Sequence, residues 1–112
     1  MKKTLVAALV TLVAMPSSLA LAGEYIHNWG SISHLEDYGD DVYVHGLDLS
    51  PNPALCSTPD HARLQPSLSA AKKAGLRRAL TAAFGAGRQV KVKLHSTECS
   101  GNRPTIYGVS IR

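Results

Sequence analysis

Residues 76–94 have the sequence LRRALTAAFGAGRQVKVKL, in which the spacing of apolar residues changes from the period of a helix to that of a strand. In its first half, apolar residues recur at intervals of three and four, which is typical of one face of an α-helix. They are Leu76, Ala79, Leu80, Ala83 and Phe84. We predict a helix over residues 69–84, capped by Ser67 or Ser69 and ended by Gly85 and Gly87. We expect the apolar residues, Phe84 included, to face the core.

In the second half, valine and leucine alternate with lysine, which is typical of a half-buried strand over residues 90–95. A turn at residues 99–102 then precedes a last strand. That strand is marked by Thr105, Tyr107, Val109 and Ile111.

Upstream of the helix, residues 25–35 predict a first strand, bent at Gly30. Residues 38–41 have turn chemistry, and residues 42–45 alternate as a second strand. Gly46 then shifts the phase of the pattern, which predicts a bulge in a strand that continues to Leu49.

A short third strand over residues 61–64 completes the order β-β-β-α-β-β. This order predicts a mainly β fold with one helix, an OB-like five-stranded Greek-key barrel. A two-layer α+β sandwich is the alternative.

The first residues have the three regions of a secretory signal peptide. Met1-Lys2-Lys3 is positive, residues 4–15 are apolar and Ala20-Leu21-Ala22 offers small residues for cleavage. The apolar run is shorter than the roughly 20 residues that span a bilayer. We therefore predict a signal peptide over residues 1–22 and one periplasmic or secreted domain over residues 23–112, with no membrane span.

Both cysteines, Cys56 and Cys99, lie in the predicted exported part, where an oxidising compartment favours a disulfide. Neither lies in a CxxC pair. Two free thiols or a metal site are the alternatives.

Charge is divided along the chain, whose formal net charge is +4. Between Gly23 and Asp60 there are acidic residues and no Lys or Arg, whereas the basic residues of the predicted mature chain lie after His61. We expect the two parts to neutralise each other, within or between subunits; the alternative is a basic face for an anionic partner.

No catalytic or nucleotide-binding motif is present, so we predict no enzyme and no cofactor. No pair of histidines has local metal-ligand spacing; His45 and His95 are the pair that a shared sheet surface would bring together. The turn that contains Glu36, Asp37, Asp40 and Asp41 predicts a solvated acidic patch.

Aromatic and basic residues give the candidate ligand-binding set, because ring faces pack on sugars and cations pair with anions. The set is Trp29, Tyr25, Tyr43, Lys91, Lys93 and Arg77. For the aromatic residues, filling the core is the alternative. Export argues against nucleic acid as the partner.

Residues 80–90, LTAAFGAGRQV, with Cys56 before and Cys99 after them, resemble a group of small secreted proteobacterial proteins, mostly of unknown function. The group shares a strand, a Cys, a short strand ending in Leu, a helix ending in LLAAxxsG-K/R-x-V, a strand and a second Cys. The resemblance covers residues 42–111. More distantly, the layout is similar to the OB-fold binding subunits of five-subunit bacterial toxins of the subtilase cytotoxin type. That resemblance implies glycan binding and a ring-shaped homo-oligomer, and it transfers no sugar-binding residue to this chain.

Three functions remain open on these grounds. The leading hypothesis is an exported, non-enzymatic binding or assembly domain for a glycan, another anionic surface or a protein. The alternatives are a metal-handling protein or small enzyme that uses its histidines, and an inhibitor of a partner enzyme.

Overall fold

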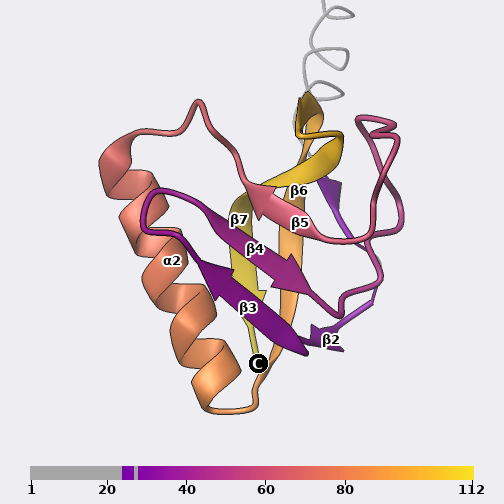
Figure 1. Cartoon of the computed structure of the whole chain (residues 1–112). Coiled ribbons are helices and arrows are strands. Elements are labelled where there is room, and N and C mark those ends of the chain that lie inside the picture. The colour runs from indigo at the N-terminus through magenta and orange to yellow at the C-terminus, as the bar shows by residue number, and fades with distance from the viewer. Residues whose placement is uncertain (1–23, 27) are drawn as a thin grey trace, which may run out of the picture.

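The computed structural model describes residues 24–26 and 28–112, and the predicted signal peptide lies outside them (Figure 1). The described part is mainly β, a half-barrel with one helix and one disulfide. Its elements are β1 Glu24–Tyr25, β2 Gly30–Ser31, β3 His34–Asp37, β4 Val42–His45, β5 Ala62–Leu64, α2 Ala70–Gly85, β6 Gln89–Ser100 and β7 Arg103–Ile111.

The helix α2 is confirmed almost residue for residue. Ser69 is its N-cap, and the Ser69 side chain accepts a hydrogen bond from the Lys72 backbone N at 3.2 Å. The chain leaves the helix through Gly87, whose φ of +65° favours glycine. The helix packs against β7 and β3 along one side of the curved sheet (Figure 1).

The prediction that Phe84 belongs to the core is wrong, because this residue is 41% exposed. The buried face of α2 consists of Leu76, Leu80 and Ala83. Phe84 follows Ala83 and lies about 100° further round the helix. It therefore falls at the margin of the apolar stripe.

The strand order of the sheet is β1-β6-β7-β5-β4-β3, with β2 also paired to β6. All pairs are antiparallel except β5 with β7. The N-terminal segment, residues 24–37, therefore lies at both ends of this order. Its first part pairs with β6 and its last part with β4.

The prediction of one bent strand over residues 25–35 is thus wrong in its continuity. The change of partner from β6 to β4 separates β3 from β2, whereas β1 and β2 both pair with β6 in different registers. Gly30, the predicted bend, is the first residue of β2, where it pairs with Val90.

Gly46 does not form a bulge in a longer strand, as its position suggested, because β4 ends at His45. Its φ is +99°, and a Cβ at this position would lie 2.7 Å from the backbone N of Ser33. Only glycine fits this turn without strain. Leu49 is still buried, but it lies in the connection after the strand.

The core lies between the inner face of the half-barrel and α2. It includes Val42 and Val44 of β4, Leu64 of β5, Leu80 of α2 and the alternating residues of β6. The last two strands form a hairpin whose turn residues, Gly101 and Asn102, both have positive φ, the requirement of a type I′ turn. This confirms the turn predicted at residues 99–102.

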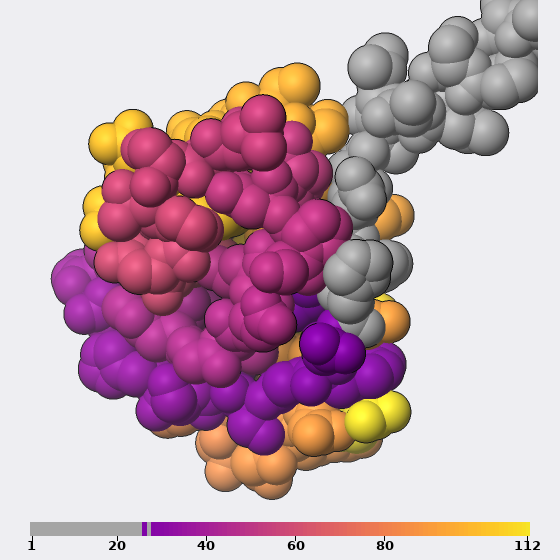
Figure 2. All heavy atoms as spheres, turned by 90° about the vertical axis from the view of Figure 1, so that its right-hand side faces the viewer, coloured from indigo at the N-terminus to yellow at the C-terminus, as the bar shows by residue number. Residues whose placement is uncertain are grey.

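The long connection between β4 and β5 lies over the middle and upper part of the face seen in Figure 2, above the indigo N-terminal strands. The Cys56–Cys99 disulfide, with a Cα–Cα distance of 5.8 Å, fastens it to the end of β6. The Asn52 side chain bonds both to the Cys56 carbonyl, at 2.9 Å, and to its backbone N, at 3.2 Å. The predicted disulfide is confirmed, and it indicates an oxidising location outside the cytoplasm. No helix in the described part is long and apolar enough to cross a membrane.

Candidate functional site

The outer face of β6 and β7 has a row of cations beside aromatic rings. Val90, Val92 and Leu94 point into the core, so strand alternation places the lysines between them on the outer face. The register of β2 with β6, which pairs Gly30 with Val90, extends to place Trp29 next to Lys91. We call Trp29, Lys91, Lys93, Tyr107 and Arg112 the cationic–aromatic strip.

The contacts within the strip are cation–π contacts. The Arg112 guanidinium carbon lies 4.7 Å from the centroid of the Trp29 ring, and Lys91 Nζ lies 5.5 Å from it. Lys93 Nζ lies 5.6 Å from the centroid of the Tyr107 ring. Two aromatic rings are thus each held beside positive charge.

A glycine makes the second of these contacts possible. Gly108 pairs with Lys93, and a Cβ added to Gly108 would lie 3.2 Å from the Lys93 Cβ. Because no side chain occupies this position, Lys93 has room beside Tyr107. The register shift between Lys93 and Leu94 is the irregularity that places Tyr107 there.

The predicted ligand-binding residues divide into those that gather at the strip and those that do not. Trp29, Lys91 and Lys93 come together, and neither Trp29 nor Tyr43 belongs to the buried core. Tyr25 pairs through its backbone with Lys93, and its side chain lies outside the described part. Tyr107 and Arg112 were missed. Simple alternation groups Tyr107 with Thr105, Val109 and Ile111, so it did not indicate the position of Tyr107 in the strip.

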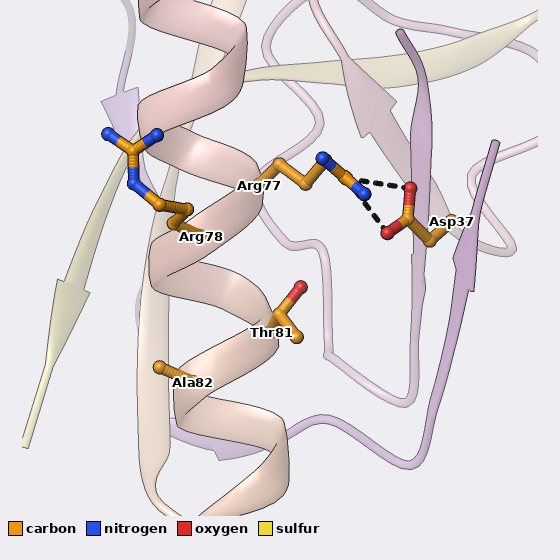
Figure 3. Close-up of a pocket in the computed structure, with 5 residues that line it drawn as sticks. All are labelled: Asp37, Arg77, Arg78, Thr81 and Ala82. Carbon is orange, nitrogen blue, oxygen red and sulfur yellow. Dashed lines mark hydrogen bonds and ion pairs between the residues drawn. The ribbon is translucent and has the colours of Figure 1, made fainter. Parts of the chain in front are cut away.

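Arg77 does not join the strip. Its Nε lies 2.9 and 2.8 Å from the two carboxylate oxygens of Asp37, which ties α2 to β3. Figure 3 shows Arg77 pointing to Asp37 while Arg78 points away, on the wall of a shallow pocket that also includes Thr81 and Ala82. The Gly39 backbone N–H and Arg77 hold the pKa of Asp37 below its usual value. Arg77 is therefore a structural ion-pair partner.

A second cluster lies on β3, β4 and β5. The β3–β4 register pairs His34 with His45, and the β4–β5 register places His61, just before β5, beside His45. The ring centroids are 5.1 Å apart for His34 and His45 and 4.6 Å apart for His45 and His61. We call these three residues the histidine row.

Tyr43 lies next to the histidine row, with its ring 5.1 Å from that of His61. The Arg63 guanidinium carbon lies 4.1 Å from the centroid of the Tyr43 ring. Tyr43 therefore contacts His61 and Arg63, neither of which belongs to the cationic–aromatic strip.

His45 and His95, which a shared sheet surface would have brought together, do not meet, because β5 and β7 separate their strands. His95 instead contacts Tyr107, and its Nδ1 accepts hydrogen bonds from the backbone N–H groups of Thr97 and Glu98. The signal for the true arrangement was available in the sequence. Folding residues 34–45 about the predicted turn at residues 38–41 sets His34 opposite His45.

Glu36 lies beside two members of the histidine row, His34 and His45, because it follows His34 by two positions and faces the same side of β3. Its carboxylate oxygens lie 3.2 Å from His45 Nε2 and 3.6 Å from His34 Nε2. The hydrogen bond with His45 is the main cause that lowers the pKa of Glu36. The ligand atoms of His34, Glu36 and His45 all lie within 4.8 Å of one another, so these residues could hold a metal ion.

His61 plays a different part from the other two histidines. Its Nδ1 lies 3.0 Å from Asp60 Oδ1, and its Nε2 accepts from Arg63 Nε at 3.1 Å. Burial lowers its pKa against the opposing effect of Asp60. Both ring nitrogens are engaged, and His61 serves to pack against His45.

Asp60 also links the acidic and basic parts of the chain. Its two carboxylate oxygens accept from Arg103 at 2.9 and 3.2 Å, and this contact lowers the pKa of Asp60 to about 2. With Asp37 and Arg77, this makes two ion pairs between the acidic N-terminal part and the basic C-terminal part. The expected mutual neutralisation therefore occurs within one chain at these two points.

No family model, curated protein or solved structure matches this chain significantly.

Proposed function

We propose that this chain is an exported binding domain, without catalytic activity, that recognises acidic glycans through the cationic–aromatic strip. The observation that carries the proposal is the alternation of cation and ring from Arg112 over Trp29 to Lys91, and from Lys93 to Tyr107. An aromatic face packs against the apolar face of a pyranose ring. Ammonium and guanidinium groups next to it pair with carboxylate or sulfate groups on the same sugar. A neutral glycan would pack against the aromatic rings but would offer no anionic group to the cations.

The proposal includes an OB-like Greek-key barrel. Supporting it, the interrupted segment of β1, β2 and β3 counts as one strand, which gives five strands with the helix between the third and fourth. That segment pairs at both ends of the sheet order, as closure of a barrel requires. The disulfide supports export, to the periplasm or beyond.

Binding to a panel of immobilised glycans tests the function. The panel should include sulfated, uronic-acid and neutral oligosaccharides of equal length, and the protein should carry its intact disulfide. We expect retention of the acidic members, weakened by added salt because exposed charge pairs are screened. Trp29→Ala should weaken binding by about tenfold, since it removes the ring that the sugar contacts. Lys93→Gln should weaken it as well.

A matched control separates this site from general attraction to positive charge. Lys73→Gln removes the same charge from the side of α2 that lines a hollow with Gly39 and Asp40, and it should leave the affinity unchanged. Equal losses from Lys73→Gln and Lys93→Gln would show that net charge alone causes retention. Equal retention of neutral and acidic glycans would also contradict the proposal.

The resemblance to five-subunit toxin subunits extends the proposal to a ring-shaped homo-oligomer. Light scattering after size exclusion measures the mass of the exported protein directly. A closed ring is the expected result, because several weak sites on one face then act together. The mass of a monomer would contradict the proposed ring-shaped oligomer. The glycan panel would then test the binding function of the single chain.

A further inference from the structure

We infer that His34, Glu36 and His45 form a binding site for a divalent transition-metal ion, of which Zn²⁺ is the simplest occupant. The site lies on the β3–β4 hairpin, and it stands on contacts that are independent of the glycan-binding strip. Among the residues that the structure describes, these three form the group whose potential ligand atoms converge.

The backbone register places all three ligands. His34 pairs directly with His45, and Glu36 lies two positions along β3 on the same face. Directly opposite residues in an antiparallel pair have Cβ atoms about 5 Å apart, close enough for both imidazoles to reach one ion. Because the ligands belong to paired strands, the hydrogen-bond ladder fixes their spacing before any ion binds.

The distances suit a small ion. Glu36 Oε1 lies 3.2 Å from His45 Nε2, and Glu36 Oε2 lies 3.6 Å from His34 Nε2. In a tetrahedral zinc site with bonds of about 2.0–2.1 Å, ligand atoms are separated by about 3.3 Å. With all three atoms within 4.8 Å of one another, small rotations of the exposed His34 side chain would complete the geometry.

The donor set determines the class of ion. Two imidazole nitrogens and one carboxylate favour Zn²⁺, Cu²⁺ or Ni²⁺ over Ca²⁺ and Mg²⁺, which prefer oxygen ligands. Three protein ligands leave a coordination position open for water or for an external ligand. Side-chain exposures of 60% for His34, 33% for Glu36 and 29% for His45 give an ion direct access from solvent.

The neighbouring His61 supports the site without belonging to it. Its ring lies 4.6 Å from that of His45, at an interplanar angle of 28°, and limits the orientations open to His45. Both nitrogens of His61 are already engaged, by Asp60 and by Arg63. His61 is thus a positioning residue, and the metal has three protein ligands.

Isothermal titration with ZnCl₂ alone tests the inference, on exported protein that has been stripped with chelator and keeps its disulfide. We expect one ion per chain. His34→Ala should weaken binding by at least about 10- to 100-fold, the range that even supporting contacts around metals contribute. Glu36→Gln keeps the shape of the side chain, removes the charged ligand and should weaken binding as well. MgCl₂ should give no saturable heat.

His95→Asn is the matched control. It removes an imidazole from another strand and keeps an acceptor for the amides of Thr97 and Glu98. This variant should bind Zn²⁺ like the parent protein. Absence of saturable binding at 100-fold molar excess of Zn²⁺ would overturn the site, and so would equal affinities of His34→Ala and the parent. A loss in His95→Asn as large as that in His34→Ala would assign the binding to surface histidines in general.

Co²⁺ provides a second readout that does not depend on affinity. The His34–Glu36–His45 site should give intense visible absorption bands of a four-coordinate ion, and addition of Zn²⁺ should remove them. A spectrum identical to that of aqueous Co²⁺ would contradict the assigned ligands. Circular dichroism of His34→Ala confirms that the fold is retained, which the 60% exposure of its side chain leads us to expect.

Discussion

Removing the Cys56–Cys99 disulfide is expected to cost this domain a large part of its stability. The two cysteines are 43 positions apart, and the loop between them contains β5, α2 and most of β6. Closing a loop of this length reduces the conformational entropy of the unfolded chain by the equivalent of about 4 kcal/mol at 25 °C. Domains of this size have free energies of unfolding on the order of 5–10 kcal/mol. The disulfide therefore accounts for a substantial fraction of the total.

Urea unfolding of the Cys56→Ala/Cys99→Ala double variant measures this contribution. With a slope of about 1–1.5 kcal/mol per molar urea, the loss corresponds to a fall of about 3–4 M in the midpoint. Cys56 is buried, so alanine at this position avoids an unsatisfied hydroxyl group. The parent protein under reducing conditions is the control and should unfold at a similar midpoint. A fall of less than about 1 M in both samples would refute the loop-entropy reasoning.

Three further perturbations have defined outcomes. Gly46→Ala should lower the free energy of unfolding, measured in urea, by about 1–3 kcal/mol, because φ is +99° and the new Cβ would clash with Ser33. Gly75→Ala is the control, since Gly75 lies in the helix and nothing is within 4 Å of the added Cβ. This control should raise the free energy of unfolding by about 0.5–1 kcal/mol. Leu80→Ala should lower the free energy of unfolding by about 2–5 kcal/mol in the same assay, because Leu80 is fully buried. A decrease below about 1 kcal/mol, typical of an exposed site, would contradict the packing of α2 on the sheet. Asp60→Asn addresses pH: the pKa of Asp60 is about 2 in the fold against 3.8 unfolded, so its contribution is present above pH 3.8 and lost as the pH falls towards 2. Melting temperatures should therefore fall less steeply in Asp60→Asn than in the parent between pH 5 and pH 2; parallel curves would be inconsistent with the Arg103 contact.

Local periodicity predicted the elements whose side chains meet water on one face and the core on the other. The helix at Ala70–Gly85 and the alternating strand from Val90 are of this kind, and Ser69 and Gly87 at the helix ends have local chemistry that identifies them. The separation of β3 from β1 and β2 follows from a change of partner, from β6 to β4. The residues of β6 are far away in the sequence, so no local pattern indicates the change.

The candidate sites follow the same rule. Trp29, Lys91 and Lys93 were predicted as ligand-binding residues by type. The strip adds Arg112 and also Tyr107, which a register shift that local pattern does not indicate places beside Lys93. The cluster of His34, Glu36 and His45 depends on one hairpin register. Pairing the residues on either side of the predicted turn at residues 38–41 would have placed His34 opposite His45 and identified the cluster. His61 was beyond reach, because its place depends on how β5 pairs with β4.

The position of residues 24–37 at both ends of the sheet also bears on when the chain acquires its structure. Glu24 pairs with Leu94, and Ser31 pairs with Gln89. The first residues of the described part therefore pair with residues that are synthesised much later. Contacts so distant in sequence delay folding relative to synthesis. The edge of the sheet that β1 and β2 make with β6 therefore forms only after β6 has been synthesised.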